Sequence, residues 1–116
     1  MSAPPKKYIE LSEIIHEMRE VRKRLNIASI QIFNLARDKA EAERKYKVAL
    51  RQEMLKLKKE GHAATLINDL AKGEETIAQL RFERDIAKEL YVSGLESMKQ
   101  TRTEASLLQT ISKYND

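Results

Sequence analysis

The sequence predicts an all-α protein: an antiparallel two-helix hairpin of long, coiled-coil-like helices, with a short helix at the turn, assembling into a dimeric bundle. Apolar residues recur at alternating intervals of three and four in two long runs, which is the spacing of a coiled-coil seam. The 116 residues include only 2 Pro and 3 Gly, and both prolines precede the first run. Charged residues make up 34% and aromatic residues 5%, which is typical of a helical bundle, and 41% apolar content argues against a disordered chain.

The first predicted helix covers residues 8–60, after a disordered tail at residues 1–7, and residues 8–116 form a single domain. Its seam is interrupted at Lys39. The seam comprises Leu11, Ile14, Met18, Val21, Leu25, Ala28, Ile32, Leu35, Ala42, Tyr46 and Ala49. An alternative is a break between Arg22 and Asn26, which would fold residues 8–22 back as a separate short helix, because Asn is a weak helix former.

Two glycines mark the turn of the hairpin. Gly61 ends the first helix, and residues 63–72 form a short helix that ends at Gly73, with Leu66, Ile67 and Leu70 pointing inward. The last helix covers residues 74–113 and repeats the seam, with polar interruptions at Arg84 and Thr101. This second seam comprises Ile77, Leu80, Ala87, Tyr91, Gly94, Met98, Ala105 and Leu108.

The two predicted helices differ in length, so one end of the longer helix is expected to lack a partner. A register that sets small residues against each other near the turn, Ala49 beside Ala87, places Arg24 opposite Ser112 and leaves residues 8–23 as an overhang. The overhang is about 24 Å long at ~1.5 Å per residue. Its apolar face is expected to bind protein, either a second copy, most simply in a dimer, or a host or phage protein. That face comprises Leu11, Ile14, Ile15, Met18 and Val21.

The positive charge of the chain is concentrated in its first half. Residues 1–60 hold 15 Lys and Arg against 9 Asp and Glu, whereas the remaining residues hold 7 against 9. Within the first half, Arg37, Arg44, Arg51 and Lys58 recur every seven residues and therefore share one face of the helix. This basic stripe is either the solvated outer face that a coiled coil requires or a sequence-independent binding site for DNA or RNA.

The residues that catalysis usually needs are missing from the sequence. There is no Cys, no Gly-rich phosphate loop and no Ser-His-acid set, and His16-Glu17 lacks the second histidine of a zinc-protease helix. We therefore expect no enzyme, no metal site and no cofactor. No run reaches the ~18 apolar residues of a membrane span, and no secretory signal is visible, so a cytoplasmic protein that does not bind membranes is expected.

One stretch of the sequence resembles a known group. The Gly-bounded turn from Glu60 to Gly73, the Leu-Arg-Phe-Glu-Arg-Asp stretch at residues 80–85 and an Ala-x-x-x-Tyr pattern from Ala42 to Tyr46 resemble small uncharacterised helical-hairpin proteins of tailed phages and prophages of Gram-positive bacteria. The resemblance spans about residues 40–112. It implies a phage-encoded protein of the host cytoplasm with a role around phage DNA replication or recombination, and it provides no active residues to transfer.

Overall fold

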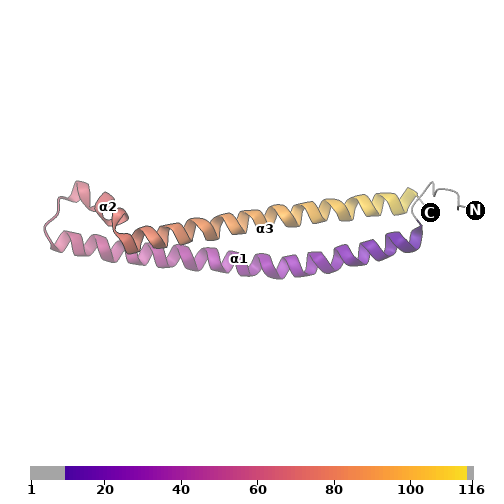
Figure 1. The fold of residues 1–116 in the computed structure, drawn as a ribbon, viewed down its shortest axis with the longest axis horizontal. Coiled ribbons are helices and arrows are strands. Elements are labelled where there is room, and N and C mark those ends of the chain that lie inside the picture. Colours follow the sequence, from indigo (N-terminus) through magenta and orange to yellow (C-terminus); the bar gives the residue numbers. More distant parts are fainter. Residues whose placement is uncertain (1–9, 115–116) are drawn as a thin grey trace, which may run out of the picture. The chain divides into compact units, whose positions relative to one another are not determined.

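A computed structural model describes residues 10–114, and these residues form three helices: α1 (Leu11–Lys59), α2 (Ala64–Gly73) and α3 (Glu75–Tyr114). The two long helices pack against each other as an antiparallel hairpin, with α2 between them in the chain (Figure 1). The predicted all-α hairpin with a short helix at the turn is thus confirmed, whereas its assembly into a dimeric bundle stays a prediction. The predicted helix ends differ by at most three residues from those observed. α1 continues through Asn26, so the alternative of a break there is wrong. The expected tail at residues 1–7 lies outside the described residues.

Helices α1 and α3 each contribute to two compact units. Among the described residues, the terminal unit comprises residues 10–31 and 94–114, and the turn unit comprises residues 32–93, including α2. Both units are built on the two predicted seams. In each unit the seam positions are buried or half-buried, except for the exposed Leu11, and most positions on the outer faces are exposed.

The end of α1 is fixed by a glycine. Gly61 has a φ of 86°, in the left-handed region that favours glycine. Its N–H donates to the carbonyl of Lys58, and the N–H of His62 donates to the carbonyl of Leu57, at 3.1 and 3.2 Å. These two hydrogen bonds form a Schellman motif, which satisfies carbonyl groups that the end of the helix leaves unpaired.

Glu74 lies between α2 and α3 and makes hydrogen bonds to both helices. Its N–H donates to the carbonyl of Ala71 at the end of α2, and its carbonyl accepts from Ala78 in the first turn of α3. Its carboxylate accepts the N–H of Ile77 at 3.0 Å, as an N-terminal cap does. Hydrogen bonds from the backbone N–H groups of Ile77 and Thr76 lower the pKa of Glu74.

The short helix α2 covers the last turns of α1. Ile67 and Ala71 are buried against Leu57, and Leu50 and Met54 pack around this cluster. The inward orientation predicted for Ile67 is therefore confirmed. The inward orientation predicted for the two neighbouring leucines is wrong, because Leu66 and Leu70 are exposed.

Because α2 occupies the last turns of α1, α3 begins its pairing with α1 further back than expected. In the turn unit, Tyr46 of α1 meets Arg84 rather than residue 90. In the terminal unit, Arg24 forms an ion pair with Glu104 at 2.9 Å, whereas the predicted register placed Ser112 there. The predicted register is therefore wrong by roughly one heptad in each unit.

Candidate protein-binding surfaces

The overhang predicted at residues 8–23 is wrong for the residues that the structure describes. Ile14 and Val21 are 0% and 2% exposed, and Leu108 of α3 lies beside Ile14 in a shallow hollow of the terminal unit. The shifted register explains this burial, since it carries α3 alongside the first turns of α1. Of the five residues predicted to bind protein, Ile14 and Val21 are thus core residues.

The other three residues of that predicted face remain partly accessible. Met18 is half-buried, and Leu11 and Ile15 are exposed. Ile15 and Met18 line a groove of about 340 Å3 in the terminal unit. We name it the arginine-rimmed groove. Its lining residues are Ile15, Met18, Arg19, Val21, Arg22, Leu25, Ala105 and Gln109.

The predicted basic stripe lies on the surface of the turn unit. Arg37, Arg44, Arg51 and Lys58 are all exposed, as the sequence analysis expected of one outer face. One of the four has an acidic neighbour, because Arg44 Nε donates to Glu41 Oε2 at 3.1 Å. This hydrogen bond lowers the pKa of Glu41 and raises that of Arg44. The stripe therefore offers three cations that are not ion-paired to described residues.

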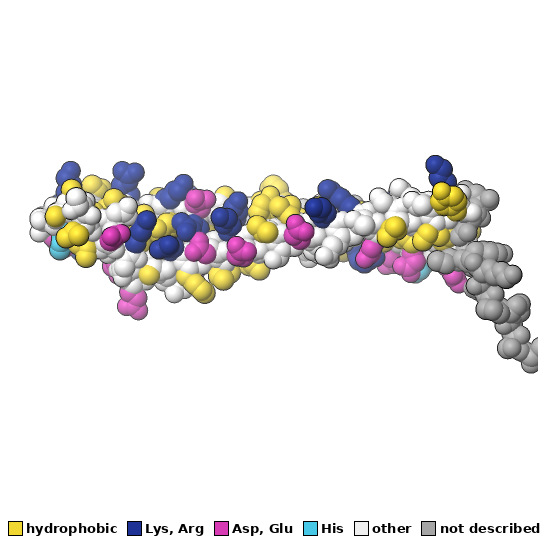
Figure 2. All heavy atoms as spheres, turned by 90° about the horizontal axis from the view of Figure 1, so that it is seen from above, with side chains coloured by type: hydrophobic (Ala, Val, Ile, Leu, Met, Phe, Trp, Pro, Cys, Tyr) yellow, Lys and Arg dark blue, Asp and Glu magenta, His cyan; other side chains and the backbone are white. Residues whose placement is uncertain are grey.

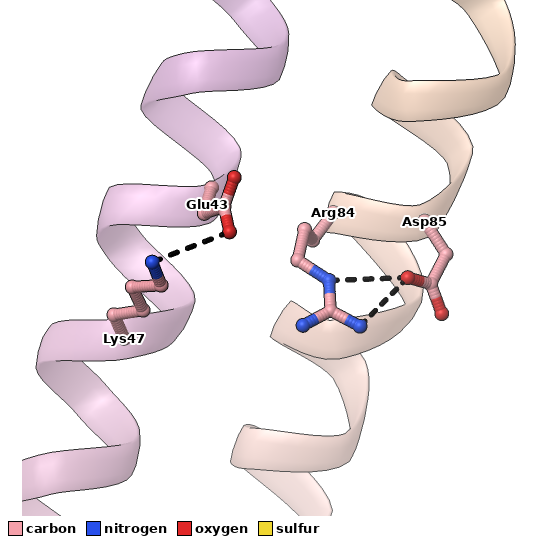
Figure 3. Close-up of polar contacts among 4 residues, drawn as sticks. All are labelled: Glu43, Lys47, Arg84 and Asp85. Atoms are coloured by element: carbon pink, nitrogen blue, oxygen red, sulfur yellow. Dashed lines mark hydrogen bonds and ion pairs between the residues drawn. The ribbon is translucent and has the colours of Figure 1, made fainter.

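Two cations interrupt the seam of the turn unit, and each lies over a tyrosine of the facing helix. Lys39 Nζ is 5.1 Å from the centre of the Tyr91 ring, and Arg84 Cζ is 4.6 Å from the centre of the Tyr46 ring. Asp85 accepts two hydrogen bonds from Arg84, at 3.1 and 2.8 Å (Figure 3). Sequence analysis found the polar interruptions without their partners, although both tyrosines were visible in the seam. These contacts join the two helices across the seam, and Lys39 and Tyr91 also line a shallow hollow of about 210 Å3 with Glu43.

A second apolar surface lies on α3, away from the seam. Phe82, Ile86 and Leu90 are 60%, 45% and 54% exposed. They are spaced four residues apart, so they follow one another along one face of the helix. We name them the apolar ridge. Figure 2 shows apolar side chains reaching the surface among the charged ones.

The apolar ridge is flanked by acidic residues. On a helix with 100° between residues, Glu83 and Glu89 project on either side of the ridge, whereas Arg81, Arg84 and Lys88 project away from it. Both glutamates are exposed. Sequence analysis missed this surface because it followed the seam, although the spacing of the three apolar residues was a usable signal.

Comparison with protein-family models, with curated proteins and with solved structures finds no match to this chain. None of the helices described between residues 10 and 114 is long and apolar enough to cross a membrane.

Proposed function

We propose that this chain is a non-enzymatic protein–protein interaction module that associates with copies of itself through the apolar ridge. The observation that carries the proposal is the exposure of Phe82, Ile86 and Leu90 side by side on one helix face. Single exposed apolar residues are common on proteins, but a contiguous group of large ones marks an interaction surface.

The energetics of a hairpin favour such an association. Full burial of a large apolar side chain contributes about 1.5–3 kcal/mol, so covering three half-exposed ones contributes roughly 1 kcal/mol apiece. A hairpin of two long helices buries only one stripe on each helix, and further contacts add stability that its own small core does not supply. Burial of the ridge between copies would provide those contacts.

The direct test compares the oligomer size of the wild type with that of a ridge variant, Phe82→Gln with Leu90→Gln. Gln keeps a good helix former at each position, so the variant should remain helical and lose mass by light scattering. The matched control is Ile30→Gln with Leu107→Gln, which replaces two similarly exposed apolar residues outside the ridge. A ridge variant that retains the wild-type mass would remove the ridge from the contact.

The second candidate function is sequence-independent binding of nucleic acid by the basic stripe. It is supported by the exposure of Arg37, Arg51 and Lys58 on one face. Replacing the four stripe residues with Glu should abolish a DNA mobility shift that weakens steeply with salt. If the wild type gives no shift at low salt, this candidate is excluded.

A further inference from the structure

The arginine-rimmed groove combines an apolar floor with unneutralised positive charge. Met18, Leu25 and Ala105 line it, and its only charged lining residues are Arg19 and Arg22. Both arginines are exposed, and neither forms a hydrogen bond or an ion pair with any residue between 10 and 114. Guanidinium groups pair well with carboxylates, so the groove suits an apolar segment with acidic edges.

The neighbouring cations of α1 are already paired, which singles out these two arginines. Lys23 Nζ lies 3.3 Å from Glu20, and Arg24 lies 2.9 Å from Glu104. Arg102 adds a third cation on the groove side of the terminal unit. It is exposed, and because it precedes Gln109 by seven residues, the two residues lie on the same face of α3. Arg19, Arg22 and Arg102 thus place unpaired positive charge on the groove side of this unit.

The same chain carries a surface of the opposite kind in its turn unit. The apolar ridge presents Phe82, Ile86 and Leu90 between two exposed glutamates, with no cation of α3 on that face. Its apolar side chains are suited to contact the apolar floor of the groove, and the glutamates at its edges have the charge opposite to that of the arginines at the rim. Recognition of an amphipathic helix in an apolar groove follows this pattern, with side chains at intervals of three and four residues as anchors.

We propose that the arginine-rimmed groove of one copy binds the apolar ridge of a second copy. Met18 suits the floor of such a site because its flexible thioether adapts to the shape of the docked side chain. Arg19 and Arg22 pair with Glu83 and Glu89 of the second copy. This inference rests on the proposed self-association and names the surface that receives the ridge.

The proposed contact joins two different surfaces, so it can be repeated from copy to copy. Such a contact produces a ring where the rotation closes and a filament where it does not. The mass is therefore expected to rise with protein concentration, to a dimer where two copies exchange the contact reciprocally and beyond a dimer where they do not. Opposite charges at the rim also predict that the assembly weakens as salt is added.

A charge-swap experiment tests the contact. The groove variant carries Arg19→Glu and Arg22→Glu, so its groove and its ridge are both acidic. The ridge variant carries Glu83→Lys and Glu89→Lys, so both of its surfaces are basic. Each variant alone should scatter light with a mass close to the 13.4 kDa of a single chain. An equimolar mixture should regain the wild-type mass, because every groove then meets a ridge of opposite charge.

The matched control is Arg37→Glu with Arg51→Glu, which makes the same change of charge outside the groove and should keep the wild-type mass. Circular dichroism of each variant confirms that the helices are intact. If the mixture stays at the mass of its components while Phe82→Gln with Leu90→Gln still reduces the wild-type mass, the groove is not the receiving surface and the proposed function stands. If the wild type is a single chain at every concentration, both proposals are overturned.

Discussion

The turn unit and the terminal unit use the same seam with different side chains. In the turn unit, the centre of the seam holds two cations stacked on tyrosines, Lys39 on Tyr91 and Arg84 on Tyr46. In the terminal unit, the most deeply buried residues are the aliphatic Ile14 and Val21. The first arrangement depends on particular partners, and the second depends mainly on apolar contact, since its ion pair between Arg24 and Glu104 is exposed to solvent.

This difference indicates that the two units have different effects, one on which register the helices adopt and the other on how stably they pack. Aliphatic side chains stay buried after a shift by one heptad, because each then meets another seam residue. A stacked cation loses its aromatic partner after the same shift and becomes a charge in a half-buried position. We therefore infer that the tyrosine pairs of the turn unit select the register, and that Ile14 and Val21 stabilise the helices once the register is set.

The largest effect is expected from Ile14→Ala in the terminal unit. Ile14 is fully buried, so its truncation leaves a cavity and should lower the free energy of unfolding by about 3 kcal/mol in urea denaturation. Ile15→Ala is the matched control, because the adjacent isoleucine is exposed and its loss should cost under about 1 kcal/mol. Equal effects of the two substitutions would show that the first turns of α1 are not covered by α3, as the sequence-based overhang required.

The same reasoning explains which part of the fold could be predicted from the sequence. Helix ends were predictable because Gly61, with its positive φ, and Glu74, whose carboxylate caps α3, have local effects on the backbone. The buried face of each helix was predictable because the seam has a period of 3.5 residues. The register of the two helices was not predictable from the seam, since a slip by one heptad preserves that period. Pairing Arg84 with Tyr46 would have identified the correct register.

The candidate site was less predictable than the fold. The exposure of Arg37, Arg51 and Lys58 follows from their position opposite the seam, and it is confirmed. The assignment of Ile14 and Val21 to a binding surface failed because it depended on the register. The arginine-rimmed groove is formed by residues of two helices, 15–25 and 105–109, so it becomes recognisable only when their pairing is known.

A smaller effect is expected from the contact between Arg84 and Tyr46. A double-mutant cycle with Arg84→Leu and Tyr46→Leu should give a coupling energy of about 0.5–1 kcal/mol, because the pair is partly shielded from water. Urea denaturation of the wild type, the two single variants and the double variant provides this value. A coupling energy of zero would show that the ring and the guanidinium contribute independently, and the register would then need another cause.

The smallest effect is expected at the start of α3 in the turn unit, where the Glu74 carboxylate accepts the N–H of Ile77. This hydrogen bond lowers the pKa of Glu74 in the folded chain, so its contribution to stability is present above the pKa of the unfolded chain. The contribution is lost as the pH falls through the lower pKa of the folded chain. The melting temperature of the wild type should therefore fall more steeply between about pH 5 and pH 3 than that of Glu74→Gln.

Glu75→Gln is the control, because no hydrogen bond to the Glu75 carboxylate occurs among residues 10–114, and it should keep the wild-type slope. If Glu74→Gln has the wild-type slope as well, the cap does not contribute to the stability of the turn unit, and its register depends on the tyrosine pairs and α2 alone.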